Sequence, residues 1–151
     1  WRLLTGHWLH LNVSHFALNF IAGLVLVIWV KPHVRTAEIA LQLFLLSLLL
    51  GLCLLQFVPQ LSWYGGLSGI LHGFLCLYSI RLFFLQRSRW WAGIFLLVWL
   101  KIAVEQHAGS SAQVVSFNDF PVIIEAHILG AILGTLLAVV QVLIVTARFR
   151  Q

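Results

Sequence analysis

The chain has 151 residues, of which 62% are hydrophobic and 9% charged, and its mean hydropathy is +1.02. Soluble domains carry about 25% charged residues, so this composition excludes a soluble globular domain and indicates an integral protein of the lipid bilayer. The net charge of +5 does not indicate a nucleic-acid partner, because most of the nine Lys and Arg residues lie between apolar runs and form no patch.

Five apolar stretches follow one another along the chain, over residues 9–30, 37–58, 67–85, 90–104 and 122–146. Each is long enough to approach or complete a membrane crossing. Each should be a helix, because an open sheet edge in lipid would leave backbone groups unsatisfied. The expected fold class is therefore all-α, a polytopic transmembrane helix bundle that forms a single membrane domain over residues 1–151.

Basic residues after the first, third and fifth stretches predict that these ends are cytoplasmic. Lys31, His33 and Arg35 follow the first stretch, Arg87 and Arg89 follow the third with Arg81 close by, and Arg148 and Arg150 follow the fifth. The opposite, outer side holds Arg2, loop 59–65 and loop 107–121, with Asp119 in the second loop and Glu105 and Glu125 at its edges.

Four polar residues lie at one depth below the predicted outer face: Ser68, His127, His15 and Asn19. A polar or ionisable group inside a membrane span costs free energy and indicates function by default. His15 and Asn19 are four residues apart and share one helix face, where two donors can serve an oxyanion. Ser68 needs a base to remove its proton, and imidazole is the usual base near neutral pH.

Small residues predict how the helices that carry these groups approach each other. His127, Gly130 and Gly134 follow one helical stripe, and Gly69 and Gly73 form a small-xxx-small pair beside Ser68. Such pairs let helix backbones come close in a membrane. We expect the third and fifth stretches to pack together.

Each of these features also has a purely structural interpretation. A lone Ser in a membrane helix usually bonds to its own backbone, a lone His can be a packing residue, and glycine pairs are mostly packing devices. The occurrence of all of them at one depth favours a functional site.

Taken together, these residues resemble the rhomboid family of intramembrane serine proteases, over the length of the chain. The resemblance lies in three stretches: Trp1-Arg2 with Thr5, His10, His15 and Asn19; Gly66-Leu67-Ser68-Gly69, similar to the family's GxSG; and Ala126-His127 with Gly130 and Gly134, similar to its AHxxGxxxG.

The resemblance implies that Ser68 is the nucleophile, that His127 is the general base, and that His15 and Asn19 line the oxyanion hole with the Ser68 amide. The family uses a dyad without an acidic third member, and no acid lies on the face of His127, since Glu125 should point elsewhere. On this mapping the chain lacks the first helix of a six-helix core. No cofactor and no metal are expected.

His72 and Gly66 are the candidate supporting residues. Four residues after Ser68, many rhomboids have an aromatic residue where this chain has His72. Its imidazole can stack on His127, bond to Ser68 or compete as the base, and the resemblance favours His127 as the base. The run from Tyr64 to Gly73 resembles the rhombosortase branch, whose members are implied to process bacterial proteins with a Gly-rich, hydrophobic and basic C-terminal tail.

The expected function is that of an intramembrane serine endopeptidase. It would cleave single-pass membrane proteins near the outer edge of their transmembrane segment, from a site that opens to the periplasmic side of a bacterial inner membrane. One alternative is a catalytically inactive relative that acts as a membrane chaperone or scaffold. A metal or proton carrier is disfavoured, because the polar residues stop at the outer half and the inner half of each span reads as apolar.

Overall fold

The computed structural model describes residues 1–108 and 122–148, and all regular structure within these ranges is helical. The elements are α1 (Arg2–Thr5), the 3-10 turn η1 (Gly6–Trp8), α2 (Val13–Val30), α3 (Thr36–Phe57), α4 (Ser68–Gln86), α5 (Arg89–Ala108) and α6 (Ile124–Arg148). The predicted all-α class is confirmed. Four helices, α2, α3, α4 and α6, are long and apolar enough to cross a membrane, whereas a crossing by α5 stays a prediction. Asp119 and Arg150 lie outside the described residues.

Two helix boundaries differ from the predicted spans in ways that affect the site. The first long helix begins at Val13 rather than near residue 9, because the extended Asn12 caps it: the Asn12 side-chain oxygen accepts a hydrogen bond from the His15 amide at 2.8 Å. Helix α5 continues to Ala108, past the predicted end at residue 104. Glu105 therefore lies on a helix and not at the edge of a loop, which corrects the sequence-based placement.

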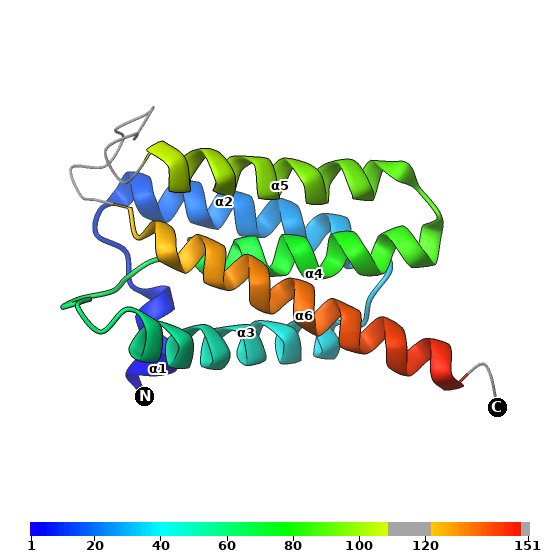
Figure 1. Cartoon of the computed structure of the whole chain (residues 1–151), viewed down its shortest axis with the longest axis horizontal. Helices are drawn as coiled ribbons and strands as arrows, with labels where there is room; N and C mark the ends of the chain where they lie inside the picture. Colours follow the sequence, from blue (N-terminus) through cyan, green and yellow to red (C-terminus); the bar gives the residue numbers. More distant parts are fainter. Residues whose placement is uncertain (109–121, 149–151) are drawn as a thin grey trace.

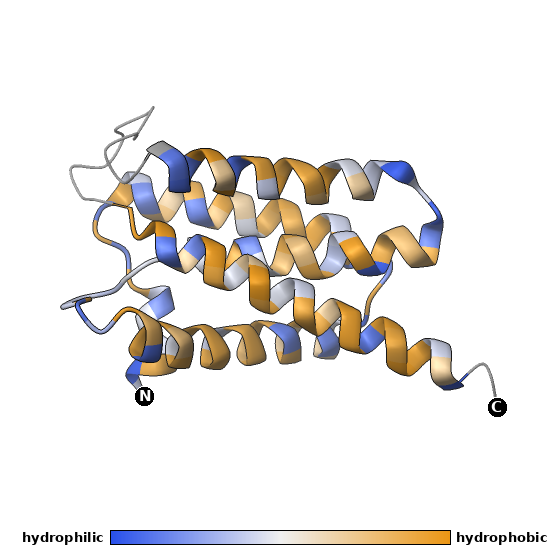
Figure 2. Cartoon of the chain, viewed as in Figure 1, coloured by the Kyte–Doolittle hydropathy of each residue, from blue (hydrophilic) through white to orange (hydrophobic). Residues whose placement is uncertain are grey.

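Helix α4 is the centre of the bundle and packs against α2, α3, α5 and α6 (Figure 1). The apolar segment of α4 is 61% buried inside the bundle, compared with 17% for the apolar segment of α2. Apolar residues dominate the middle of the helices, and hydrophilic residues gather toward their ends, as a lipid-facing bundle requires (Figure 2). Because α4 is central, its first residue, Ser68, is surrounded by several helices.

Glycines bring α4 and α6 into backbone contact. A Cβ added at Gly130 would lie 2.0 Å from the Gly69 carbonyl oxygen, and one added at Gly134 would lie 1.9 Å from the Gly73 carbonyl oxygen. No side chain fits at such a separation, so both glycines are needed for this approach. The predicted packing of these two helices is confirmed, and it sets the distance between Ser68 and His127.

Polar groups are also buried at the end of the bundle opposite Ser68. Arg81 of α4 forms an ion pair with Glu38 of α3, and its guanidinium lies 5.4 Å from the centre of the Tyr78 ring. Gln42 and Ser79 are buried in the same halves of α3 and α4. The expectation that this half of the spans is apolar is therefore wrong, because helix packing shields these side chains from lipid.

Candidate active site

Ser68 is the first residue of α4 and follows a turn that only glycine adopts readily. Gly66 has a φ of 126°, a conformation that side chains other than glycine's rarely tolerate. The first amides of a helix have no intrahelical acceptor, so the Ser68 N–H points out of the helix end together with the positive end of the helix dipole. The hydroxyl and its own amide are thus presented at one site.

His127 lies directly opposite this hydroxyl. Its Nε2 atom is 2.9 Å from Ser68 Oγ, and the residue is only 4% exposed. His127 is in the first turns of α6, next to Ala126, whose carbonyl oxygen would lie 2.8 Å from a Cβ at Gly69. The glycine contact between α4 and α6 therefore holds the imidazole within hydrogen-bonding distance of the serine.

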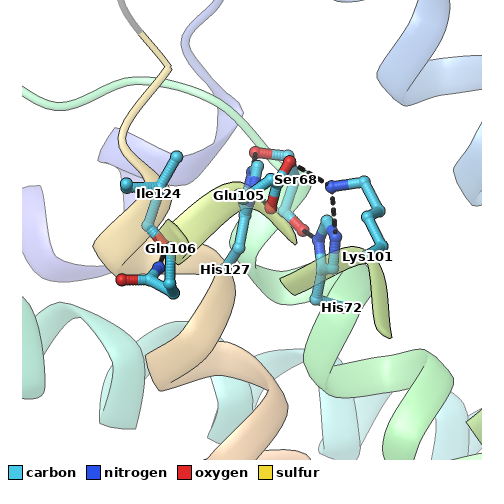
Figure 3. A network of polar contacts seen from close by, with 7 residues as sticks. All are labelled: Ser68, His72, Lys101, Glu105, Gln106, Ile124 and His127. Carbon is cyan, nitrogen blue, oxygen red and sulfur yellow. Dashed lines mark hydrogen bonds and ion pairs between the residues drawn. The ribbon is translucent and has the colours of Figure 1, made fainter. Parts of the chain in front are cut away.

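The other nitrogen of His127 bonds to an acid that sequence reasoning missed. His127 Nδ1 lies 2.9 Å from Glu105 Oε2, and Glu105 comes from α5 (Figure 3). The sequence-based expectation covers only acids on the helix of His127 and places Glu105 at the edge of a loop. The signal that could have revealed this acid is the charged pair Lys101 and Glu105, four residues apart inside or beside an apolar stretch. A charge inside a membrane usually has a partner.

Lys101 and His72 complete this polar network. Lys101 bonds to the second carboxylate oxygen, Oε1, of Glu105, and its ammonium lies 3.0 Å from His72 Nε2. His72 Nδ1 lies 2.7 Å from the Ser68 carbonyl oxygen, and the His72 ring stacks on His127 with centroids 4.2 Å apart and planes 18° apart. His72 thus stacks on His127 and bonds to the backbone of Ser68, which are two of the three roles left open by the sequence.

The partners of His72 decide its protonation. A carbonyl oxygen can only accept a hydrogen bond, so Nδ1 carries the proton, and the Lys101 ammonium can only donate, so Nε2 is the acceptor. Both nitrogens are then engaged. His72 has no free lone pair to take a proton from Ser68, which leaves His127 as the group suited to act as base.

His15 and Asn19 lie on the other side of the serine turn. A Cβ added at Gly66 would be 2.9 Å from His15 Nε2 and 4.0 Å from Asn19 Nδ2, so both side chains face this turn, as their shared helix face predicts. Asn19 Nδ2 and His15 Nδ1 are buried without a hydrogen-bond partner. Buried polar groups normally have partners, and unpaired ones beside the turn that leads to Ser68 are suited to a group that forms only during a reaction.

The His10 ring packs edge-on against that of His15, with centroids 5.1 Å apart. His10 Nδ1 lies 3.0 Å from the Trp8 carbonyl oxygen, so the ring that contacts His15 is itself held by the backbone.

A second histidine network, also missed from the sequence, supports Gly66 from the N-terminal segment. His7 is 1% exposed; its Nε2 lies 2.9 Å from the Ser47 carbonyl oxygen and its Nδ1 lies 3.0 Å from the Tyr64 hydroxyl. Tyr64 Oη in turn lies 3.1 Å from the Gly66 carbonyl oxygen. Burial lowers the pKa of His7 and raises the pKa of Tyr64, so the imidazole is neutral and the phenol keeps its proton.

The ligand atoms of His72, Glu105 and His127 lie within 4.8 Å of one another, close enough to share a metal ion. However, the Lys101 ammonium is bonded to two of these three residues. A positive charge that belongs to the chain thus occupies the same cluster, and a divalent cation would have to displace it.

An apolar cavity of 250 Å³ adjoins the site between α2, α3 and α4. Asn19 and Leu67 line it at the level of Ser68, and Gly23, Leu71 and Phe74 line it further along. An apolar side chain next to a reacting group could be accommodated there.

Comparison with known proteins gives one match. No curated protein and no solved structure matches the chain. A family model described as the Rhomboid domain matches residues 1–143, which is nearly the whole sequence and includes every residue of the site. Together with the helical bundle and its four apolar spans, this match shows that the chain belongs to the rhomboid family, whose members are generally intramembrane serine proteases.

Proposed function

We propose that this protein is an active intramembrane serine endopeptidase in which Ser68 is the nucleophile and His127 the general base. The observation that carries the proposal is the distance of 2.9 Å between Ser68 Oγ and His127 Nε2, beside buried and unpaired donors on His15 and Asn19. A nucleophile, a base and candidate oxyanion donors are the three parts that acyl transfer requires.

In the proposed reaction, Ser68 Oγ attacks the carbonyl carbon of the scissile peptide bond while its proton passes to His127 Nε2. The oxyanion accepts hydrogen bonds from the Ser68 amide, His15 and Asn19. The C–N bond breaks, the amine leaves with the proton from His127, and water, activated by the same imidazole, hydrolyses the acyl-enzyme. Every step uses side chains of this chain and requires no cofactor or metal.

The proposed substrates are membrane-anchored proteins cleaved near the outer edge of their transmembrane segment. Ser68 and His127 lie in the first turns of α4 and α6. We assign this end of the helices to the outer, periplasmic side of a bacterial inner membrane, because the basic residues gather at the opposite end. We further assign the chain to the rhombosortase branch on the run from Tyr64 to Gly73, with substrates that end in a Gly-rich, hydrophobic tail. The apolar cavity beside Leu67 is consistent with an apolar segment at the site.

The test is labelling of the purified protein in detergent with a fluorophosphonate, which reacts only with an activated serine. We expect wild type to be labelled, and both Ser68→Ala and His127→Ala to lose labelling while they keep the helical circular dichroism of wild type. A folded wild type that does not react would support the alternative, a catalytically inactive membrane chaperone or scaffold.

The substrate class is tested separately with a reporter that carries a Gly-rich, hydrophobic C-terminal tail. We expect its cleavage in membranes to depend on Ser68. Equal cleavage of a reporter whose glycines are replaced by leucines would contradict the rhombosortase assignment and leave the protease assignment intact.

A further inference from the structure

The strongest unassigned feature is the chain of contacts that runs from Ser68 through His127 to α5. Ser68 Oγ, His127 Nε2, His127 Nδ1 and Glu105 Oε2 form two successive hydrogen bonds of 2.9 Å each. Side chains from three helices contribute: Ser68 from α4, His127 from α6 and Glu105 from α5 (Figure 3).

We propose that Glu105 is a positioning residue that turns the proposed Ser68–His127 pair into a three-residue unit by holding the His127 imidazole in the tautomer that can accept the Ser68 proton. The proposal deepens the proposed protease function and rests on it. A carboxylate can only accept hydrogen bonds, so its contact requires a proton on Nδ1 of His127. In the neutral ring Nε2 is then unprotonated and faces Ser68 Oγ as an acceptor.

The carboxylate also acts on the charge that forms during the reaction. When Ser68 gives up its proton, His127 becomes an imidazolium, and a carboxylate 2.9 Å away stabilises that positive charge. The His127 side chain is 5% exposed, so solvent screens this interaction only weakly. Charge stabilisation of this kind adds to the orienting effect and is lost when the carboxylate becomes an amide.

Lys101 and Gln106 hold Glu105 in place. The Lys101 ammonium takes the Oε1 atom of Glu105, which leaves Oε2 for His127. Gln106, the next residue on α5, donates a hydrogen bond of 3.2 Å to the Ile124 carbonyl oxygen at the start of α6. The two helix ends are therefore fastened to each other beside the imidazole, and the carboxylate has one partner for each oxygen.

Among residues 1–108 and 122–148, the remaining polar groups around His127 leave no other residue for this role. His72 faces the ring of His127 by stacking, and its two nitrogens bond to the Ser68 carbonyl and to Lys101. Glu125 lies two residues before His127 on the same helix but is exposed. Glu105 is the acid that the structure places on Nδ1.

The first experiment is ¹⁵N NMR of histidine-labelled wild type in detergent near neutral pH. Signals are assigned to His127 by their loss in His127→Ala. We expect a protonated Nδ1 and an unprotonated Nε2. An unprotonated Nδ1 would overturn the proposal, and because this measurement needs no Glu105 variant it does not depend on how such variants fold.

The second experiment measures fluorophosphonate labelling rates per folded molecule for Glu105→Gln, Glu105→Asp and the matched control Glu125→Gln. We expect Glu105→Gln to slow labelling about 100-fold, within the range for loss of acid–base assistance. Glu105→Asp should recover part of the rate, because the charge is kept, and Glu125→Gln should react as wild type does. Equal rates for Glu105→Gln and Glu125→Gln would sink the proposal.

The outcomes separate this inference from the proposed function. If wild type is not labelled at all, the protease assignment fails, while the NMR signal of His127 still reports whether the ring holds the tautomer that a hydrogen bond to Glu105 requires. If labelling requires Ser68 and His127 but is indifferent to Glu105→Gln, the protease assignment stands and the role of Glu105 is wrong. If Glu105→Gln is labelled more slowly only because part of the protein is unfolded, that result also counts against the positioning role.

Discussion

Two histidines are buried in the described part of the chain, His127 and His7, and their surroundings look alike at first but differ in what they can do. Each lies within 3.0 Å of a hydroxyl, that of Ser68 for His127 and that of Tyr64 for His7. The second nitrogen of His127 meets the Glu105 carboxylate, whereas that of His7 meets the Ser47 backbone carbonyl. A carboxylate can stabilise an imidazolium, and a neutral carbonyl does so much less.

The two hydroxyls differ as well. Ser68 stands at a helix start, and the unpaired donors of Asn19 and His15 lie beside the turn that leads to it. The Tyr64 hydroxyl oxygen lies 3.1 Å from the Gly66 carbonyl oxygen, and burial raises the pKa of Tyr64, so the phenol keeps its proton and is a poor nucleophile. The unpaired donors and the nearby acid therefore distinguish the surroundings of His127 and Ser68 from those of His7 and Tyr64.

The largest expected effect is the contrast between His127→Ala and His7→Ala. His127→Ala should lower the labelling rate per folded molecule at least about 10³-fold. His7→Ala should leave the rate per folded molecule within several-fold, yet lower the free energy of unfolding by about 1–3 kcal/mol, because a buried carbonyl and a buried hydroxyl lose a partner. Labelling kinetics and thermal unfolding in detergent measure the two effects, and a reversed pattern would refute the distinction between the networks.

Gly66→Ala should damage both networks at the point where they meet. Its φ of 126° strains any side chain, and the new Cβ would lie 2.8 Å from His15 Cε1. We expect the labelling rate to fall about 100-fold as the proposed oxyanion donors shift, within the range for losing such a donor. The control is Gly93→Ala, where the new Cβ meets nothing within 4 Å and activity should not change. Normal activity in Gly66→Ala would show that the turn and the donors are more adaptable than the contacts indicate.

His72→Phe separates stacking from proton transfer. Phenylalanine keeps an aromatic face against His127 but cannot bond to the Ser68 carbonyl or to Lys101. We expect the labelling rate to fall by no more than about tenfold, below the range for loss of a general base. A loss as large as that of His127→Ala would mean that His72 is the base.

Lys101→Met should make the site sensitive to divalent metal ions. Without the ammonium, the ligand atoms of His72, Glu105 and His127, all within 4.8 Å of one another, can gather around Zn²⁺. Zn²⁺ should then slow labelling of Lys101→Met at concentrations that spare wild type, and added chelator should reverse the effect. Adding His72→Phe should abolish the sensitivity, and equal Zn²⁺ inhibition of wild type and Lys101→Met would show that the ammonium does not exclude the ion.

The smallest effect concerns pH. Burial lowers the pKa of His7 in the folded protein below its ordinary value of 6.5, so the unfolded chain binds the proton more readily. His7 therefore makes stability fall as the pH drops below 6.5, while above that value both states are neutral at this residue. Thermal unfolding of wild type and His7→Gln at about pH 7.5 and about pH 5.5 isolates this contribution. We expect stability to fall less between the two pH values in His7→Gln than in wild type. Equal decreases in the two proteins would contradict this role of His7.

Composition and residue spacing were sufficient to predict the helical membrane fold, the approach of α4 to α6, and the region of Ser68, His127, His15 and Asn19. These features are encoded locally: apolar length decides which segments can span, and glycines at helical spacing decide which faces can touch. The match to the Rhomboid domain confirms the resemblance at the level of the family.

The extent of α5 and the side-chain contacts between different helices could be found only in the folded structure. Apolar length could not show that α5 continues to Ala108, because a helix carries on past its apolar stretch when packing supports it. Nor could it show that Glu105 meets His127, since that meeting depends on the rotation of α5 about its own axis. The buried contacts of His7 likewise join residues 40 and 57 positions apart. Spacing along one helix predicts neighbours on that helix, whereas partners on different helices are decided by how the whole bundle packs.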